Sequence, residues 1–368
     1  MTHGVGLVGT GNISAAYLQI ARELGLFEVR AVTDLDLDRA GAQAAEHGTR
    51  AVPLEDLLAD PGIVAVVNLT PPAAHAGVSL AALRAGKHVY SEKPLAVARE
   101  DGQAILREAG ARGLRVGCAP DTFLGAGLQT GRELLDAGLI GRPVAATAFF
   151  MGGGPEAWHP GPDFFYQPGA GPLFDMGPYY LTALVNLLGG VTRVSGSAAR
   201  ALPERVIGSG PRRGERVPVQ TPTHVTAGLG FGGGQVATFI ASFDAPASDL
   251  PRTEVYGTEG TLSLPDPNTF GGPLRVRRHG DEEWETVPLT RPFARNARGI
   301  GLADMLDAIE RGTPHRASGE LAFHVLDVMH TVLEAAEAER TLDVGSRVGR
   351  PEALPARPGW LRETRAGG

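Results

Sequence analysis

Lysine is almost missing from this chain of 368 residues, since Lys87 and Lys93 are the only two among 34 lysine and arginine residues. Cysteine is scarcer still: Cys118 stands alone, which excludes an intrachain disulfide and a cysteine-based metal cluster. Long apolar runs are lacking too, because the stretch from 176 to 192 is interrupted by glycine and proline and is amphipathic. Such a stretch is not typical of a membrane-spanning helix.

Positive charge is not in excess either. The formal net charge is −7 and the isoelectric point is near 5.8, so we expect neither a nucleic-acid partner nor an anionic membrane surface. Apolar residues make up 43% and charged residues 20%, as in ordinary soluble proteins. The first basic residue is Arg22, which leaves no charged region of a signal peptide before the first apolar strand. We expect a cytoplasmic protein.

The first residues have the pattern of a dinucleotide site. An apolar stretch at 4–8 is followed by the turn "GTGNI" at 9–13 and by a helical apolar rhythm. Gly9 and Gly11 fill the first two positions of the G-x-G-x-x-G motif, and Ser14 takes the third. The first glycine permits a tight turn and the second lets the backbone approach a pyrophosphate. We therefore predict that Gly9, Thr10, Gly11, Asn12 and Ile13 bind the cofactor.

Asp34 ends the second apolar strand, 23 residues after Gly11. An acidic residue at this place accepts hydrogen bonds from the adenosine ribose and repels a 2′-phosphate, which favours NAD over NADP. The alternative is that Asp34 caps the helix that begins near Asp36 or Leu37. We predict NAD as the cofactor, with NADP the less favoured.

Strands and helices alternate up to about residue 122, which predicts a doubly wound parallel sheet of the Rossmann type. Ligands of such sheets bind beyond the carboxyl ends of the strands. The segments "TPP" at 70–72 and "EKP" at 92–94 both follow a strand, on the same edge as the glycine turn. The cofactor residues predicted from this edge are Thr70, Pro71, His75, Glu92 and Lys93.

The regular alternation of strands and helices stops after residue 122. Between 191 and about 290, strands rich in Val, Thr, Phe and Ala recur without crossover helices, and two helices close the chain. This pattern predicts a large, open, mainly antiparallel sheet in an α+β domain. We predict two domains, a Rossmann domain at 1–122 and a substrate-binding and oligomerisation domain at 123–368, whose C-terminal segment could pack back on the first.

Three motifs together are more specific than the fold: "GTGNI" at 9–13, "EKP" at 92–94 and "GPLFDMGPYYLTALVNLLG" at 171–189. With them the chain resembles the Gfo/Idh/MocA family of oxidoreductases over almost its whole length. The resemblance implies nicotinamide-dependent oxidation or reduction of a sugar, polyol or related cyclic alcohol, with Lys93 in the active site. It also implies a homodimer or homotetramer that uses the open face of the second sheet. A bend at Pro94 is expected, and both isomers of the Lys93–Pro94 bond remain open.

The family's second signature, an aspartate and a histidine one helical turn apart, is altered here. Asp175 is present, and Tyr179 takes the histidine's place. The pair resembles the Lys-Tyr branch of the family, which includes dihydrodiol dehydrogenase. A phenol is a weak base near neutral pH, but a neighbouring ammonium favours its ionised form. We predict Lys93, Asp175 and Tyr179 as catalytic; alternatively, Asp175 is a helix cap and Tyr179 a core residue.

A long loop before this helix carries aromatic residues, and loops of such length in compact domains are usually functional. We predict substrate contacts from Trp158, His159, Phe164 and Tyr166, and from Asp121 after an earlier strand. No cluster of histidine and carboxylate residues indicates a metal site. Two other functions remain open: cleavage of a glycoside with tightly held NAD and no net redox change, and a non-catalytic NAD-binding sensor. The sensor would not need Lys93, Asp175 and Tyr179 together.

Overall fold

The computed structural model describes residues 3–361, and the outermost residues of both predicted domains (1–2 and 362–368) lie outside this range. Internal contacts divide the described chain into two compact units. The first unit contains residues 3–125, 295–323 and 354–361, and the second contains 126–294 and 324–353. Residues 295–323, which the predicted boundary assigned to the second domain, therefore belong to the first unit.

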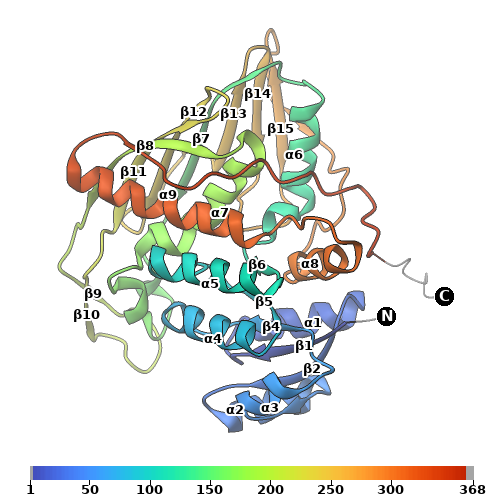
Figure 1. Ribbon diagram of the computed structural model, residues 1–368. Coiled ribbons are helices and arrows are strands. Elements are labelled where there is room, and N and C mark those ends of the chain that lie inside the picture. The colour runs from blue at the N-terminus through green and yellow to red at the C-terminus, as the bar shows by residue number, and fades with distance from the viewer. Residues whose placement is uncertain (1–2, 362–368) are drawn as a thin grey trace. The chain divides into compact units, whose positions relative to one another are not determined.

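The first unit is built on a six-stranded sheet in the order β3-β2-β1-β4-β5-β6, and every neighbouring pair is parallel. This order confirms the predicted Rossmann sheet. In Figure 1, helices α4 and α5 run across the front of this sheet. The strands are β1 (Gly4–Val8), β2 (Glu28–Thr33), β3 (Arg50–Ala51), β4 (Ala65–Asn68), β5 (His88–Ser91) and β6 (Val116–Cys118). The helices are α1 (Ser14–Leu24), α2 (Leu37–His47), α3 (Leu54–Ala59), α4 (Pro72–Arg84), α5 (Arg99–Arg112) and α8 (Ile300–Arg311), with a 3-10 turn η1 (Thr122–Leu124).

The second unit contains a nine-stranded sheet in the order β16-β15-β14-β13-β7-β12-β11-β8-β17. Only the β7–β12 pair is parallel among the described pairs of this sheet, so the predicted, mainly antiparallel sheet is confirmed. Its strands are β7 (Pro143–Met151), β8 (Val191–Ala199), β11 (His224–Phe231), β12 (Val236–Ser242), β13 (Thr253–Gly257), β14 (Gly260–Leu264), β15 (Leu274–Arg278), β16 (Glu285–Val287) and β17 (Leu342–Asp343); β9 (Glu204–Val206) and β10 (Arg216–Pro218) form a separate ribbon.

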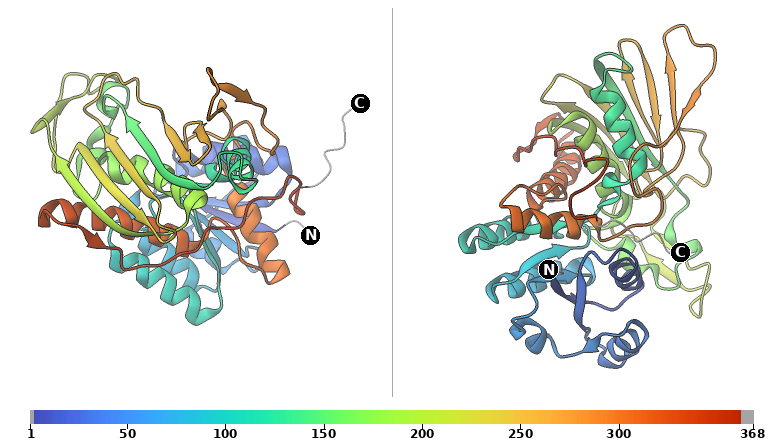
Figure 2. Two further views of the ribbon diagram at one scale, coloured as in Figure 1. Left: turned by 90° about the horizontal axis from the view of Figure 1, so that it is seen from above. Right: turned by 90° about the vertical axis from the view of Figure 1, so that its right-hand side faces the viewer.

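The helices of this unit lie on one face of the large sheet, as both views in Figure 2 show. They are α6 (Ala126–Asp136), α7 (Gly171–Leu188) and most of α9 (Gly319–Ala338), with 3-10 turns η2 (Pro155–Ala157) and η3 (Pro162–Tyr166). Helix α7 packs directly on β7, β11 and β12. This contact explains why α7 is apolar on nearly every side, since a helix surrounded by other elements has no solvent face to make polar.

Helix α7 starts at Gly171, and Pro178 lies inside it. Pro172 occupies the first turn, where a proline loses no hydrogen bond. The alternative of Asp175 as a helix cap is therefore wrong, because Asp175 lies within the helix.

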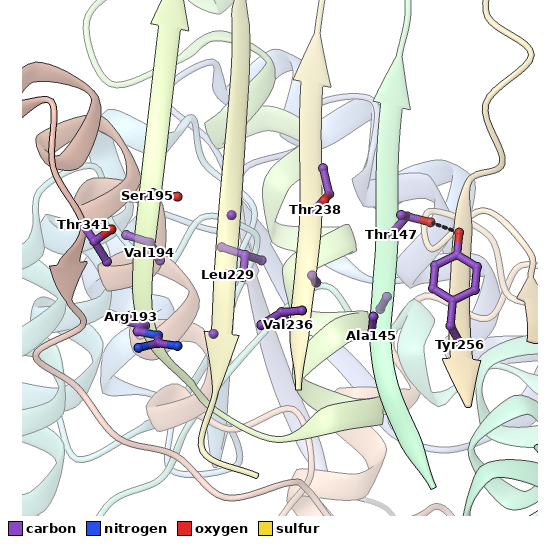
Figure 3. A pocket seen from close by; sticks show the side chains of 14 residues that line it. Ala145, Thr147, Arg193, Val194, Ser195, Leu229, Val236, Thr238, Tyr256 and Thr341 are labelled. Carbon is purple, nitrogen blue, oxygen red and sulfur yellow. Dashed lines mark hydrogen bonds between the residues drawn. The ribbon is translucent and has the colours of Figure 1, made fainter. Parts of the chain in front are cut away.

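The opposite face of the sheet carries mostly small and short side chains, together with the longer Arg193 and Tyr256. Figure 3 looks onto it, with residues of β8, β11, β12, β7 and β13 from left to right. A shallow hollow of about 570 Å³ lies over these strands, lined by Ala145, Thr147, Ser195, Leu229, Val236 and Thr238, among others. Tyr256 closes one side, and its hydroxyl lies 3.1 Å from Thr147 Oγ1.

Asp121 attaches α8 to the first unit. Its Oδ2 accepts hydrogen bonds from the backbone N–H of Gly299 (2.7 Å) and of Gly301 (3.0 Å) at the start of the helix. The side chain is almost completely buried. Burial raises the pKa of Asp121 to about 6, although the two N–H groups and Arg298 act in the opposite direction. Asp121 thus has a structural role at the start of α8, which replaces the substrate contact predicted for it.

Asp121 makes the stability of the chain depend on pH. The carboxyl group of Asp121 holds its proton more tightly in the folded chain than in the unfolded chain, where the pKa of an aspartate is about 3.9. Loss of this proton as the pH rises therefore lowers the free energy of unfolding. Relative to Asp121→Asn, the wild-type free energy of unfolding should fall by about 1 kcal/mol between pH 5 and pH 7. Urea denaturation of both proteins at the two pH values measures this difference. A difference that stays constant or increases would contradict the assignment.

Candidate active site

The glycine turn after β1 has the geometry that a pyrophosphate requires. Gly9 has a φ of 98°, and a Cβ there would lie 2.8 Å from the backbone of Leu69. A Cβ at Gly11 would meet no described atom within 4 Å, so the backbone is open to approach on that side. The next helix, α1, has Ile13 as its N-cap, without a side-chain capping bond. A phosphate can take that place, and the turn fits a dinucleotide.

Asp34 lies at the end of β2 and is tied to the glycine turn. Its Oδ2 accepts from Thr10 N (2.6 Å) and Thr10 Oγ1 (2.9 Å), and its Oδ1 accepts from Asp36 N and from Arg39 Nη2. Burial alone would raise the pKa of Asp34, but these hydrogen bonds lower it to about 2. The carboxylate is therefore charged at every physiological pH. The alternative role of Asp34 as the cap of α2 is wrong, because Asp36 is the N-cap and accepts from Arg39 N.

The loop after β4 is organised by Asn68, the last residue of that strand. The fully buried Asn68 amide donates to His75 O and to Ser79 Oγ, both at 3.0 Å. Its carbonyl oxygen accepts from Thr70 Oγ1 at 2.7 Å. One buried side chain thus fixes both Thr70 and the first turn of α4. Pro71, the N-cap of α4, lies between them.

His75 has a different place from the one predicted. It is 1% exposed, and its two ring nitrogens lie against two backbone carbonyls, Nδ1 against Pro94 O (2.6 Å) and Nε2 against Thr70 O (2.8 Å). A side chain enclosed in this way connects the two loops and does not itself present a nitrogen to a cofactor. The predicted direct cofactor contact of His75 is replaced by this link.

The segment after β5 is held from both sides. The hydroxyl of the buried Tyr17, on α1, donates to Glu92 Oε1 at 2.9 Å, and Lys93 N donates to Glu92 Oε2 at 3.1 Å. Burial, and secondarily Glu92, raise the pKa of Tyr17 well above its ordinary value, so it remains a donor. The Lys93–Pro94 bond is cis. Lys93 therefore follows β5 at the same edge of the sheet as the glycine turn and Thr70.

The other two predicted catalytic residues belong to the second unit. Asp175 and Tyr179 are four residues apart in α7, so their side chains share one face of the helix. The structure thus groups Lys93 with the predicted cofactor residues, and Asp175 with Tyr179.

The aromatic residues of the loop between β7 and α7 divide into two groups. Trp158 (66% exposed) and Phe164 (49% exposed) flank the His159 ring, with centroid distances of 5.5 and 5.4 Å. His159 Nδ1 accepts from Gly161 N, which leaves the Nε2 hydrogen to donate. These three side chains form an accessible surface with apolar rings and one donor.

Tyr166 is the exception in this loop. It is fully buried in a cluster with Phe165, Ile207, Val217, Val219 and Phe243, and its hydroxyl donates to Glu156. Burial and this contact raise its pKa. Tyr166 is a core residue, so the predicted substrate contact is wrong.

Sequence reasoning missed Asn68 and Tyr17. Asn68 carries a signal in retrospect, because an amide at the end of a buried apolar strand must find partners. Tyr17 carries none, since a tyrosine on the buried face of a helix reads as core. Within residues 3–361, no group of three or more His, Cys, Asp or Glu side chains could hold a metal ion. No helix in the same range is long and apolar enough to cross a bilayer.

Comparison with known proteins agrees with this arrangement. Residues 3–119 match the oxidoreductase family with an NAD-binding Rossmann fold, and residues 128–263 match the GFO/IDH/MocA C-terminal domain. An inositol 2-dehydrogenase of Saccharopolyspora erythraea is 38% identical over 151 residues, which cover 40% of this chain and only 44% of that relative. The dTDP-3,4-didehydro-2,6-dideoxy-alpha-D-glucose 3-reductase of Streptomyces antibioticus is 31% identical over 320 residues, covering 84% of this chain and 89% of the reductase.

The fold is shared with solved structures. Levoglucosan dehydrogenase, in a complex with NADH and levoglucosan, superimposes with a TM-score of 0.78 at 22% identity, over 94% of this chain and 99% of that one. The two family matches and the full-length relative confirm the resemblance drawn from the glycine turn and the E-K-P segment. This chain is a member of the Gfo/Idh/MocA oxidoreductase family, with the family's NAD-binding Rossmann domain at its N-terminus.

Proposed function

We propose that this protein is an NAD-dependent dehydrogenase that transfers a hydride between nicotinamide and a secondary alcohol of a sugar, polyol or related cyclic alcohol. The observation that carries the proposal is the position of Lys93, which follows β5 at the edge where Gly11 leaves the backbone open. Relatives named for inositol, a deoxyglucose derivative and levoglucosan support a ring-shaped substrate with several oxygens.

The chemistry assigns a task to each residue. The glycine turn and Asp34 would hold NAD, which would supply the hydride acceptor for the carbon that bears the alcohol. The alcohol proton must go to a base, and in this proposal the Tyr179 phenolate receives it. The Lys93 ammonium favours that phenolate and stabilises the alkoxide that develops on the substrate oxygen. Asp175, on the same helical face as Tyr179, is proposed to accept a hydrogen bond from a hydroxyl group of the substrate.

The accessible group of Trp158, His159 and Phe164 is proposed to bind substrate. Aromatic faces pack well against the C–H surfaces of sugar rings, and the Nε2 hydrogen of His159 can donate to a hydroxyl. The neighbouring Asp163 forms an ion pair with Arg212 at 2.5 Å, so its carboxylate is already engaged within the protein.

The role of Lys93 is tested by a pair of matched variants. Lys93→Arg keeps the charge but loses the compact ammonium, so kcat should fall about a hundred- to thousandfold while NAD binding and the fold are retained. The control is Lys87→Arg: Lys87 Nζ donates to the carbonyls of Asp60 (2.7 Å) and Ile63 (2.8 Å), a structural task, and its kcat should stay within about threefold of wild type. The substrate for these measurements is first identified by NADH formation in a screen of monosaccharides, inositols, anhydrosugars and glycosides. A Lys93→Arg enzyme as active as the control would overturn the mechanism.

Cofactor preference is tested at Asp34. In Asp34→Ala the carboxylate that would repel a 2′-phosphate is gone, and Arg39 loses its partner and becomes available to that phosphate. The ratio of NADP to NAD dissociation constants should drop by about tenfold or more, the size of one charged hydrogen bond. Asp36→Ala, which removes the neighbouring cap of α2, should leave the ratio unchanged. Calorimetric titration measures both constants, and equal affinities in the wild type would refute the preference.

A homodimer or homotetramer is proposed, with the open face of the nine-stranded sheet as the interface. Thr238 points onto this face from β12 (Figure 3), in the hollow described above. Thr238→Arg would place a charge in the contact and should lower the oligomer mass measured by light scattering after size exclusion. Leu202→Arg changes an exposed residue outside the sheet and serves as control. A monomeric wild type, or a Thr238→Arg protein of unchanged mass, would contradict the interface.

A further inference from the structure

His75 has no part in the chemistry proposed above, yet it lies between the two loops that carry it. The side chain comes from the first turn of α4 and is enclosed by the first unit. It faces the carbonyl of Thr70, after β4, and the carbonyl of Pro94, next to Lys93.

A proton count shows what this arrangement demands. A carbonyl oxygen only accepts hydrogen bonds, and a neutral imidazole has a single N–H. At 2.6 and 2.8 Å, both nitrogens can donate only if the ring is an imidazolium. In the neutral ring, one nitrogen turns a lone pair toward a carbonyl oxygen, and that contact must lengthen.

The surroundings of His75 decide when the second proton is lost. Burial lowers the pKa of the imidazole, the two carbonyls and the Glu92 carboxylate act in the opposite direction, and the Lys93 ammonium lowers the pKa further. The net direction is downward, so the neutral ring prevails at pH 7 and the imidazolium forms on acidification. The hydrogen that remains belongs on Nδ1, because the contact with Pro94 is the shorter of the two.

We propose that His75 is a positioning residue for Lys93: it donates from Nδ1 to the Pro94 carbonyl in both protonation states, and from Nε2 to the Thr70 carbonyl only when protonated. The Lys93 segment is then held at all working pH values. The Thr70 segment is held in acid and released as the pH rises. The meaning of "positioning" rests on the proposed catalytic role of Lys93, whereas the two hydrogen bonds do not depend on it.

The hydrogen positions can be observed directly. In protein labelled with ¹⁵N-histidine, long-range ¹H–¹⁵N spectra between pH 5 and pH 9 distinguish the Nδ1–H tautomer, the Nε2–H tautomer and the imidazolium. His75→Gln identifies the His75 signals among those of ten histidines. We expect the Nδ1–H tautomer at pH 8 and an increasing share of imidazolium toward the acidic end. An Nε2–H tautomer at pH 8, or a ring whose protonation never changes, would overturn the proposal.

The effect on the site is measured without any substrate. Wild-type affinity for NAD should weaken about fivefold across the pH range in which the ¹⁵N spectra show the ring losing its second proton, the size expected for one hydrogen bond that orders Thr70. This dependence should disappear in His75→Gln and in His75→Asn. It should persist in His315→Gln, which changes a buried histidine of the same unit that has one carbonyl partner, Val116 O. Asp121 also titrates in this range but is present in all four proteins, so the differences do not include it.

Turnover provides the second readout. With a substrate from the screen, His75→Gln should lower kcat by about tenfold, the loss expected when a catalytic group is displaced by a fraction of an ångström, while KM changes little. A merely structural histidine would leave kcat and its pH profile as in His315→Gln, and this outcome would overturn the positioning role. If no substrate is turned over, the proposed function fails, and the ¹⁵N spectra and the NAD titration still decide whether His75 switches as described.

Discussion

The parallel register of the first sheet is the constraint on which the candidate site depends. Because β1, β2, β4 and β5 run in the same direction, the glycine turn, Asp34, Thr70 and Lys93 all follow a strand at one edge, although they span more than eighty residues of sequence. Hydrogen bonds across that edge then fix the loops to one another. Thr10 binds Asp34, Tyr17 binds Glu92, and His75 faces the loops after β4 and β5.

These connections all satisfy polar groups that are removed from water. Each joins polar groups of two different segments at this edge, and each is buried or half-buried, where an unsatisfied polar group costs about 1–3 kcal/mol. The loops at this edge are therefore not independent surface segments. In the proposal above, the loss of a proton from His75 releases the Thr70 carbonyl, so a change in one loop is transmitted to the next.

Much of this could be predicted from the sequence. Glycine spacing, buried apolar strands and the E-K-P segment gave the Rossmann fold and the cofactor edge, because those patterns follow from short-range geometry. The mainly antiparallel sheet of the second unit could likewise be predicted, because strand-like segments recur in the sequence without crossover helices between them. What failed depended on contacts distant in sequence. Asp121 lies about 180 residues from the helix it binds, and Tyr166 is buried by strands that follow it, so neither local pattern nor residue type could separate them from true ligand contacts.

The scarcity of lysine has a practical consequence for anyone who modifies this protein chemically. Reagents that acylate or methylate side-chain amines leave guanidinium groups untouched, and this chain offers them only two targets. The ammonium of Lys87 is buried and donates to two backbone carbonyls, which hinders its reaction. Apart from the amino terminus, an isotopic methyl tag introduced by reductive methylation therefore reports chiefly on Lys93, giving a spectroscopic probe at the sheet edge without a single engineered residue.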